Sequence, residues 1–199
     1  MRRAWFQLLV FLSAVLPSAA FAHIGHDVSQ DGIVHGFMHP LGGADHLLAM
    51  ILVGVFAFRM GRGGAWLLPI TFVALMAFGG LLGFAAFPVP HVEIGIAISV
   101  IVFGLMVAAG AQAPLSLAAA VVGAFAVLHG HAHGAEIPVA VSLATYGTGF
   151  VLATALLHAI GLGLGAALEL LNADHKVGPY RTVGSLAATA GVFLLVGVL

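Results

Sequence analysis

Two short blocks of histidine and carboxylate carry the residue types that bind metal ions. Residues 39–46 read His-Pro-Leu-Gly-Gly-Ala-Asp-His, and residues 129–136 read His-Gly-His-Ala-His-Gly-Ala-Glu. Imidazole nitrogen and carboxylate oxygen suit Ni²⁺, Co²⁺, Zn²⁺ and Fe²⁺, whereas Cu⁺ prefers sulfur ligands. The chain has no cysteine, which excludes thiolate metal sites, disulfides and iron–sulfur clusters. The blocks therefore predict a site for a divalent transition metal.

Helical spacing divides the second block into two faces. At about 100° per residue, His129, His133 and Glu136 share one face of a helix. His131 falls on the opposite side of the same helix. If the helix continues through the glycines, we expect the first three side chains to converge and His131 to point away.

In the first block, Pro40 favours the start of a helix at that point. It also favours an extended conformation for His39, off the helix axis. Asp45 would then lie about 7.5 Å below the helix start. A carboxylate at that depth in a bilayer requires a cationic partner, either a metal ion or a protonated histidine.

The composition shows what surrounds these blocks. Of 199 residues, 62% are hydrophobic and 7% are charged, against about 25% charged residues in soluble domains. This excludes a water-soluble domain and a disordered chain, and six Lys and Arg residues cannot form a nucleic-acid-binding surface. The sequence predicts a small all-α integral membrane protein in the lipid bilayer.

The first 22 residues have the order of a secretory signal peptide. Arg2 and Arg3 precede an apolar run that ends in the small-residue pattern Ala-Phe-Ala at 20–22. Cleavage there leaves residues 23–199 as a single polytopic membrane domain whose N-terminus is outside. An uncleaved anchor helix is the alternative, and it gives the same topology.

Six segments are close to, or longer than, the roughly 20 apolar residues that a helix needs to cross the bilayer. The predicted spans are 40–58, 65–87, 92–109, 114–129, 138–168 and 182–199. With the N-terminus outside, all four basic residues after the signal peptide fall on the inner side, as the positive-inside rule requires. These residues are Arg59, Arg62, Lys176 and Arg181. We therefore expect an inner-membrane protein with a histidine-rich mouth facing the periplasm.

This topology brings three distant segments to the outer mouth. The predicted metal ligands are His39, Asp45, His46, Glu93, His129, His133 and Glu136. Further candidates are His23, His26, His35 and His158. His35 could instead sit at the lipid headgroups. His158, within the fifth span, could line an inner pathway or form a hydrogen bond with a neighbouring helix.

The two blocks and the signal sequence resemble the HupE/UreJ family of bacterial nickel permeases, over essentially the whole mature chain. The resemblance implies uptake of nickel, or of cobalt in some members, for hydrogenase or urease maturation. By position it assigns roles to His39, Asp45, His46, Phe72, Glu93, His133 and Glu136. Phe72 enters the transport pathway only through this resemblance. Larger nickel/cobalt transporters carry a His-x4-Asp-His block, whereas five residues separate histidine from aspartate here.

The predicted mechanism is facilitated diffusion, with Ni²⁺ as the substrate and no permanent cofactor. The sequence has no Gly-x4-Gly-Lys-Ser/Thr motif, so it carries no ATP-driven motor of its own. A divalent cation moving inward gains about 4.6 kcal/mol per 100 mV of membrane potential, or roughly three decades of accumulation. The potential alone could therefore drive uptake.

Two other classes compete with a permease. A membrane di-iron oxygenase or desaturase also uses clustered histidines, but its His-x2-His-His box is absent from the sequence, as is the His-Glu-x-x-His motif of zinc proteases. An ammonia or urea channel could use His158 as a pore imidazole, yet such a channel needs no carboxylates at its mouth. The sequence therefore favours a transporter over an enzyme.

Overall fold

The computed structural model describes residues 32–110, 113–171 and 178–199. Within these ranges the chain forms helices and no strand. The helices are α2 (Gly32–Gly42), α3 (Ala44–Arg59), α4 (Gly61–Phe84), α5 (Val92–Ala109), α6 (Leu115–Ala135), α7 (Leu143–Leu170) and α8 (Gly178–Val198). The predicted signal peptide, His23, His26 and Lys176 lie outside the described residues.

The helices from α4 to α8 are each long and apolar enough to cross a membrane. The pair of α2 and α3, bent by 86°, makes a sixth crossing if it is counted as one span. The prediction of an all-α, multi-pass membrane protein is therefore confirmed. The ends of the spans differ from those predicted, most usefully in α6, which continues to Ala135 and so carries all three histidines of the second block.

The predicted start of the first span is wrong. Pro40 lies inside α2, and His39 is helical rather than extended. The break comes at Gly43, whose backbone is extended (φ −103°, ψ 124°), and α3 begins at the next residue. Glycine loses more conformational freedom in a helix than any other residue, so the adjacent Gly42 and Gly43 are a natural place for a helix to stop. The proline is tolerated on the buried side of α2.

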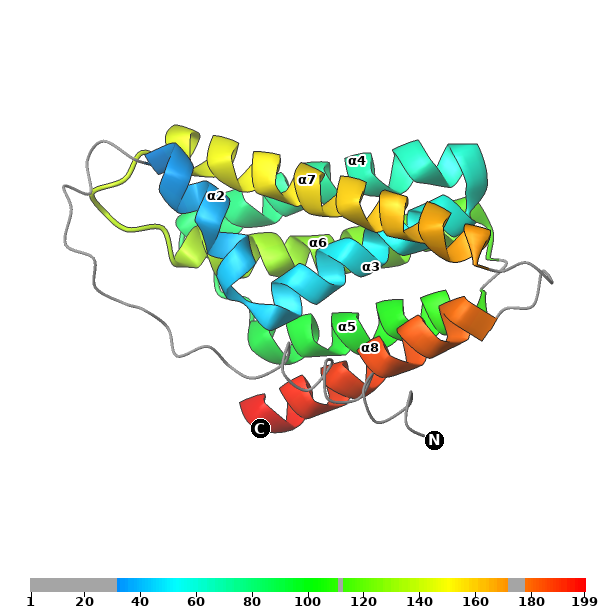
Figure 1. Cartoon of the computed structure of the whole chain (residues 1–199). Coiled ribbons are helices and arrows are strands. Elements are labelled where there is room, and N and C mark those ends of the chain that lie inside the picture. The colour runs from blue at the N-terminus through cyan, green and yellow to red at the C-terminus, as the bar shows by residue number, and fades with distance from the viewer. Residues whose placement is uncertain (1–31, 111–112, 172–177) are drawn as a thin grey trace.

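Helix α3 is the centre of the bundle. It packs against α7, α4 and α5, while α4 pairs with α6 and α5 pairs with α8 (Figure 1). Its buried apolar residues occupy all sides of the helix, as expected of a helix surrounded by others. They are Ala49, Met50, Leu52, Val53, Val55, Phe56 and Ala57. A polar side chain on α3 therefore lies close to several other helices.

Two glycines fix the rotation of α6 against α4. A Cβ atom at Gly130 or Gly134 would collide with the backbone carbonyl group of Met76 or Gly80, respectively. Small residues of this kind let helix backbones approach closely in lipid. Because successive residues turn by about 100°, the histidine that precedes each glycine lies to one side of this backbone contact with α4. The ring contacts described below show that His129 reaches α3 and that His133 reaches α2 and α3.

The far end of the bundle is held together by Arg59, the last residue of α3. Its Nη1 donates a hydrogen bond to the carbonyl oxygen of Val107 in α5, at 2.6 Å. Its guanidinium lies 4.4 Å from the centroid of the Tyr180 ring in α8. Asp45, at the other end of α3, is about 21 Å away along the helix axis. The arginine and the histidine blocks therefore occupy opposite ends of the bundle.

Candidate metal site

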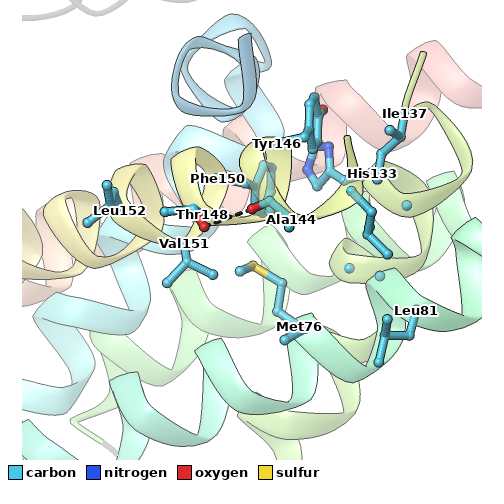
Figure 2. Close-up of a pocket in the computed structure, with 16 residues that line it drawn as sticks. Met76, Leu81, His133, Ile137, Ala144, Tyr146, Thr148, Phe150, Val151 and Leu152 are labelled. Atoms are coloured by element: carbon cyan, nitrogen blue, oxygen red, sulfur yellow. Dashed lines mark hydrogen bonds between the residues drawn. The ribbon is translucent and has the colours of Figure 1, made fainter. Parts of the chain in front are cut away.

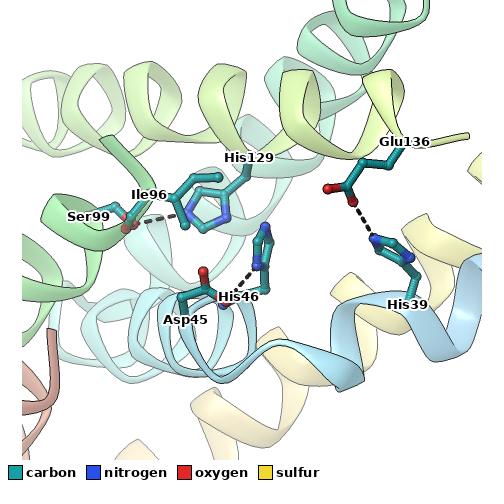
Figure 3. Close-up of polar contacts among 7 residues, drawn as sticks. All are labelled: His39, Asp45, His46, Ile96, Ser99, His129 and Glu136. Carbon is teal, nitrogen blue, oxygen red and sulfur yellow. Dashed lines mark hydrogen bonds and ion pairs between the residues drawn. The ribbon is translucent and has the colours of Figure 1, made fainter. Parts of the chain in front are cut away.

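Three side chains from the two histidine blocks meet at one end of the bundle. His39 comes from α2, His133 from the last turn of α6, and Glu136 from the residue that ends α6. Their potential ligand atoms all lie within 4.8 Å of one another. His39 Nε2 is 3.1 Å from Glu136 Oε2 (Figure 3). Donors bound to one ion at about 2.1 Å lie roughly 3–4 Å apart, so a small closure would place all three around a metal ion.

His46 enters the same region from α3 in a fixed orientation. Its Nδ1 lies 2.8 Å from Asp45 Oδ1, which also accepts the backbone N–H of His46 at 2.8 Å (Figure 3). A carboxylate only accepts, so the shared proton sits on Nδ1. The lone pair is then on Nε2, which is buried and has no hydrogen-bond partner among the described residues. Asp45 thus fixes the tautomer of His46 and leaves the lone pair on Nε2 available.

The break in the first span makes room for this pair. A Cβ atom on Gly43 would lie 2.8 Å from Asp45 Oδ1 and 3.0 Å from His46 Nδ1. Both distances are shorter than ordinary van der Waals contact. A side chain at position 43 would therefore displace the carboxylate or the imidazole from this arrangement.

A second fixed imidazole comes from His129 in α6. Ser99 Oγ in α5 donates its only proton to the carbonyl oxygen of Ile96, at 2.6 Å. The same oxygen lies 2.9 Å from His129 Nε2, so Nε2 must carry a proton and donate it (Figure 3). This leaves the lone pair on Nδ1, which is buried without a partner in the described ranges. Ser99 therefore fixes the tautomer of His129, as Asp45 fixes that of His46.

The ring of His133 connects these groups. Its centroid lies 4.1 Å from that of His46 and 4.8 Å from that of His39, and His46 lies 4.9 Å from His129. Neither nitrogen of His133 has a hydrogen-bond partner in the part of the chain that is described. We call these four rings the histidine cluster.

The charge around the cluster favours a cation. The two carboxylates beside it, Asp45 and Glu136, form ion pairs only with histidines within the described residues. No lysine or arginine there neutralises them. Unpartnered lone pairs next to uncompensated carboxylates suit a bound metal ion, because a divalent cation satisfies both.

Other predicted residues lie outside the cluster. The Nε2 atom of His131 lies 2.7 Å from the carbonyl oxygen of Phe87, so this histidine points away, as its helical position predicts. Glu93 is exposed in the first turn of α5. His35 is exposed on α2, with its ring 6.5 Å from that of Tyr146. None of these three forms a hydrogen bond or ion pair with the cluster within the described ranges.

Phe72 and His158 lie deeper in the bundle. The Phe72 ring is fully buried, 5.7 Å from the ring of His129 and 5.0 Å from that of His158. The suggestion that His158 bonds to a neighbouring helix is wrong, because neither ring nitrogen has a hydrogen-bond partner in the described structure. The other interpretation of His158, a position on an inner pathway, stays a prediction.

Sequence reasoning missed three neighbours of the cluster. Ser99 is the only hydroxyl-bearing residue of the span 92–109, and that isolation in an apolar run was an available signal. The rings of Tyr146 and Phe150 in α7 lie 5.8 Å from His39 and 4.3 Å from His133, respectively. Nothing in the spacing of these two aromatic residues separates them from ordinary core residues.

A cavity of about 520 Å³ opens beside the cluster, between α4, α6 and α7 (Figure 2). His133 contributes to its wall. Most of its lining is apolar, including Met76, Leu81, Ile137, Val151 and Leu152. Such a lining suits hydrocarbon and offers few ligands to an ion. The polar chemistry is thus concentrated in the histidine cluster and not in this cavity.

The sequence matches known proteins over most of its length. Residues 10–194 match the family described as HupE / UreJ protein. Protein HupE of Rhizobium leguminosarum bv. viciae is 43% identical over 182 residues, which cover 92% of this chain and 93% of that protein. No solved structure matches the chain significantly. On the family match and this identity, the chain belongs to the HupE/UreJ family.

Proposed function

We propose that the protein is an uptake permease for a divalent transition metal, with Ni²⁺ as its main substrate and the histidine cluster as its entry site. The observation that carries this proposal is the contact between His46, His129 and His133. Each has a buried nitrogen with no hydrogen-bond partner among the described residues. A buried acceptor without a partner costs about 1–3 kcal/mol, and a metal ion would remove that cost.

The ligands form a gradient of burial that suits stepwise dehydration. Glu136 is exposed, His39 is partly exposed, and His133 is buried. His46 is buried to a similar extent as His133, and His129 has no exposed surface. An ion entering along this order would exchange its water ligands for protein ligands a few at a time. Glu93, exposed at the start of α5, would add negative charge near the entrance.

Asp45 and Ser99 act as positioning residues in this proposal. Each fixes the proton on one nitrogen of its histidine and leaves the other nitrogen available to the metal. Such partners orient metal-binding histidines, and their loss typically costs about 10–100-fold in metal affinity. The cluster also lacks thiolate ligands, which favours an intermediate affinity that permits release.

The direction of transport follows from the charge at the two ends. By the positive-inside rule, the end that carries Arg59 and Arg62 would face the cytoplasm. The histidine cluster would then face the periplasm, with the protein in the inner membrane. The membrane potential would draw a divalent cation inward with about 4.6 kcal/mol per 100 mV, so facilitated diffusion needs no ATP. The nickel would serve hydrogenase or urease maturation, as the family resemblance implies.

Cobalt is the alternative substrate, because nitrogen and oxygen ligands bind Co²⁺ and Ni²⁺ similarly. Competition between the two ions during uptake distinguishes them. If nickel is the preferred substrate, unlabelled Ni²⁺ should inhibit uptake of radioactive Ni²⁺ at a lower concentration than unlabelled Co²⁺ does.

The central test is uptake of radioactive Ni²⁺ by cells that express the protein. We expect uptake to fall by about tenfold or more in His133→Leu and Glu136→Gln, because each removes a ligand. His131→Leu is the matched control, since it makes the same change at a buried histidine that points away from the cluster. Collapse of the membrane potential should also slow uptake by the wild type. An enzyme or an ammonia channel would show no nickel flux, and that result would exclude the proposal.

A further inference from the structure

His158 is an unusual residue for its position. It lies near the middle of α7, 15 residues after Leu143 and 12 before Leu170, or about 22 Å from the start of the helix. Only 1% of its surface is exposed. The carbonyl oxygen of His158 packs against Gly54, so α3 is close on this side. A polar ring is thus buried near the middle of a helix long enough to span a membrane, next to α3 and α4.

The His158 ring forms no hydrogen bond within the described residues. Neither Nδ1 nor Nε2 of His158 has a partner in the described part of the chain. The buried residue one turn earlier behaves differently, since Thr154 donates its hydroxyl proton to the carbonyl oxygen of Phe150 at 2.9 Å. This face of α7 therefore gives the Thr154 hydroxyl a hydrogen-bond acceptor, whereas the His158 imidazole has no partner among the described residues. Ionisable residues kept at this depth despite their cost usually serve a function.

A continuous series of rings connects the cluster to His158. From His46, the centroid distances are 4.9 Å to His129, 5.7 Å from there to Phe72, and 5.0 Å from Phe72 to His158. Phe72 is the only ring between the two groups of imidazoles in this series. Its plane is nearly perpendicular to that of His158, at 87°.

We propose that His158 is a second, deeper metal site, which receives the ion after it passes Phe72. This inference rests on the permease function proposed above. Two imidazole stations separated by one apolar ring give an ion two places to bind, with a barrier that a rotation of the Phe72 side chain would open. Binding near the bilayer midplane is the arrangement expected of a carrier. With one imidazole and mainly apolar neighbours, the deeper station would bind the ion weakly and release it toward the cytoplasm.

The first test is uptake of radioactive Ni²⁺ by His158→Leu, normalised to the amount of folded protein in the membrane. We expect a fall of about tenfold or more, because the imidazole is the only ligand that the proposal assigns to this station. Nickel binding to the purified variant, measured by equilibrium dialysis, should stay within about threefold of the wild type, because the cluster is intact. His131→Leu is again the matched control and should retain uptake.

The second test separates a ligand from a packing residue. His158→Cys replaces the imidazole with a softer ligand, so Cd²⁺ should inhibit nickel uptake at about fivefold lower concentration than in the wild type. A packing role predicts no change in sensitivity to Cd²⁺. Wild-type uptake by His158→Leu, or unchanged inhibition of His158→Cys, would overturn this inference. Absence of uptake by the wild type would instead overturn the proposed function, so the two failures are distinguishable.

Discussion

The two ends of α3 place polar groups in the same bundle in opposite ways. At the arginine end, Arg59 donates to the carbonyl oxygen of Val107 and stacks on the Tyr180 ring. The Tyr180 hydroxyl lies 2.8 Å from the carbonyl oxygen of Gly165 and 3.1 Å from Glu169 Oε2. At this end, each of these buried or half-buried polar groups has a protein partner.

At the histidine end, Asp45 and Ser99 each satisfy one nitrogen of a neighbouring imidazole. The other nitrogen of each ring has no partner among the described residues, and His133 has none for either nitrogen. Both ends belong to one bundle, and α3 joins them. A shortage of hydrogen-bonding groups throughout the bundle therefore cannot explain why polar groups have partners at the arginine end and imidazole nitrogens lack them at the histidine end. The polar groups of the arginine end stabilise the fold, whereas under the proposed function the histidine end keeps nitrogen atoms available for a metal ion, at some cost in stability.

The largest effect should come from removing the charge that orients His46. Asp45→Asn should weaken nickel binding to the purified protein by about 10–100-fold, because the proton on Nδ1 is no longer held by a carboxylate. Isothermal titration calorimetry measures the affinity. Glu169→Gln makes the same chemical change at the arginine end and should leave the affinity unaltered. Equal losses in both variants would show that the two ends do not differ in function.

The next effect is on stability at the arginine end. Arg59→Met should lower the free energy of unfolding by about 1–3 kcal/mol, since it removes a charged hydrogen bond and a cation–π contact. Nickel affinity should remain at the wild-type value, because the cluster is about 21 Å away. Denaturant unfolding in detergent and dialysis against Ni²⁺ measure the two quantities. A parallel loss of nickel affinity would contradict the division between the ends.

The smallest expected effect has the opposite sign. His133→Leu should raise the stability of the metal-free protein by about 1 kcal/mol, because a leucine of similar size has no unsatisfied nitrogen. Thermal unfolding in detergent should therefore shift upward by about 2–4 °C. His131→Leu, which removes a ring that is hydrogen-bonded to Phe87, should not gain stability. Destabilisation by His133→Leu would mean that the histidine end is also arranged for stability.

Much of this arrangement could be predicted from the sequence. Long apolar runs reveal membrane helices because few other residues tolerate lipid, and the helical repeat correctly separates His131 from His133. The positions of the first and second blocks along their spans also place them at the same end of the bundle. Periodicity and hydropathy are local properties, so they predict what depends on one helix at a time.

What the sequence could not predict depends on contacts between helices. Pro40 indicated a helix start by the usual rule, but burial of α2 against α7 keeps the helix intact through the proline. The role of Ser99 depends on its meeting a histidine 30 residues away. The two interpretations of His158 could be separated only by knowing which groups surround the ring. In each case, packing between distant segments decides the outcome.

The corner between α2 and α3 has a consequence for how few residues this site requires. In one straight helix, His39 and His46 would lie on the same face but about 10.5 Å apart along the axis, too far for both to touch a third ring. The 86° bend between α2 and α3 shortens that distance, so the His39 ring and the His46 ring both contact His133. An eight-residue stretch thereby supplies imidazole nitrogens from two directions, and the proposed entry site gains two of its ligands without a further helix.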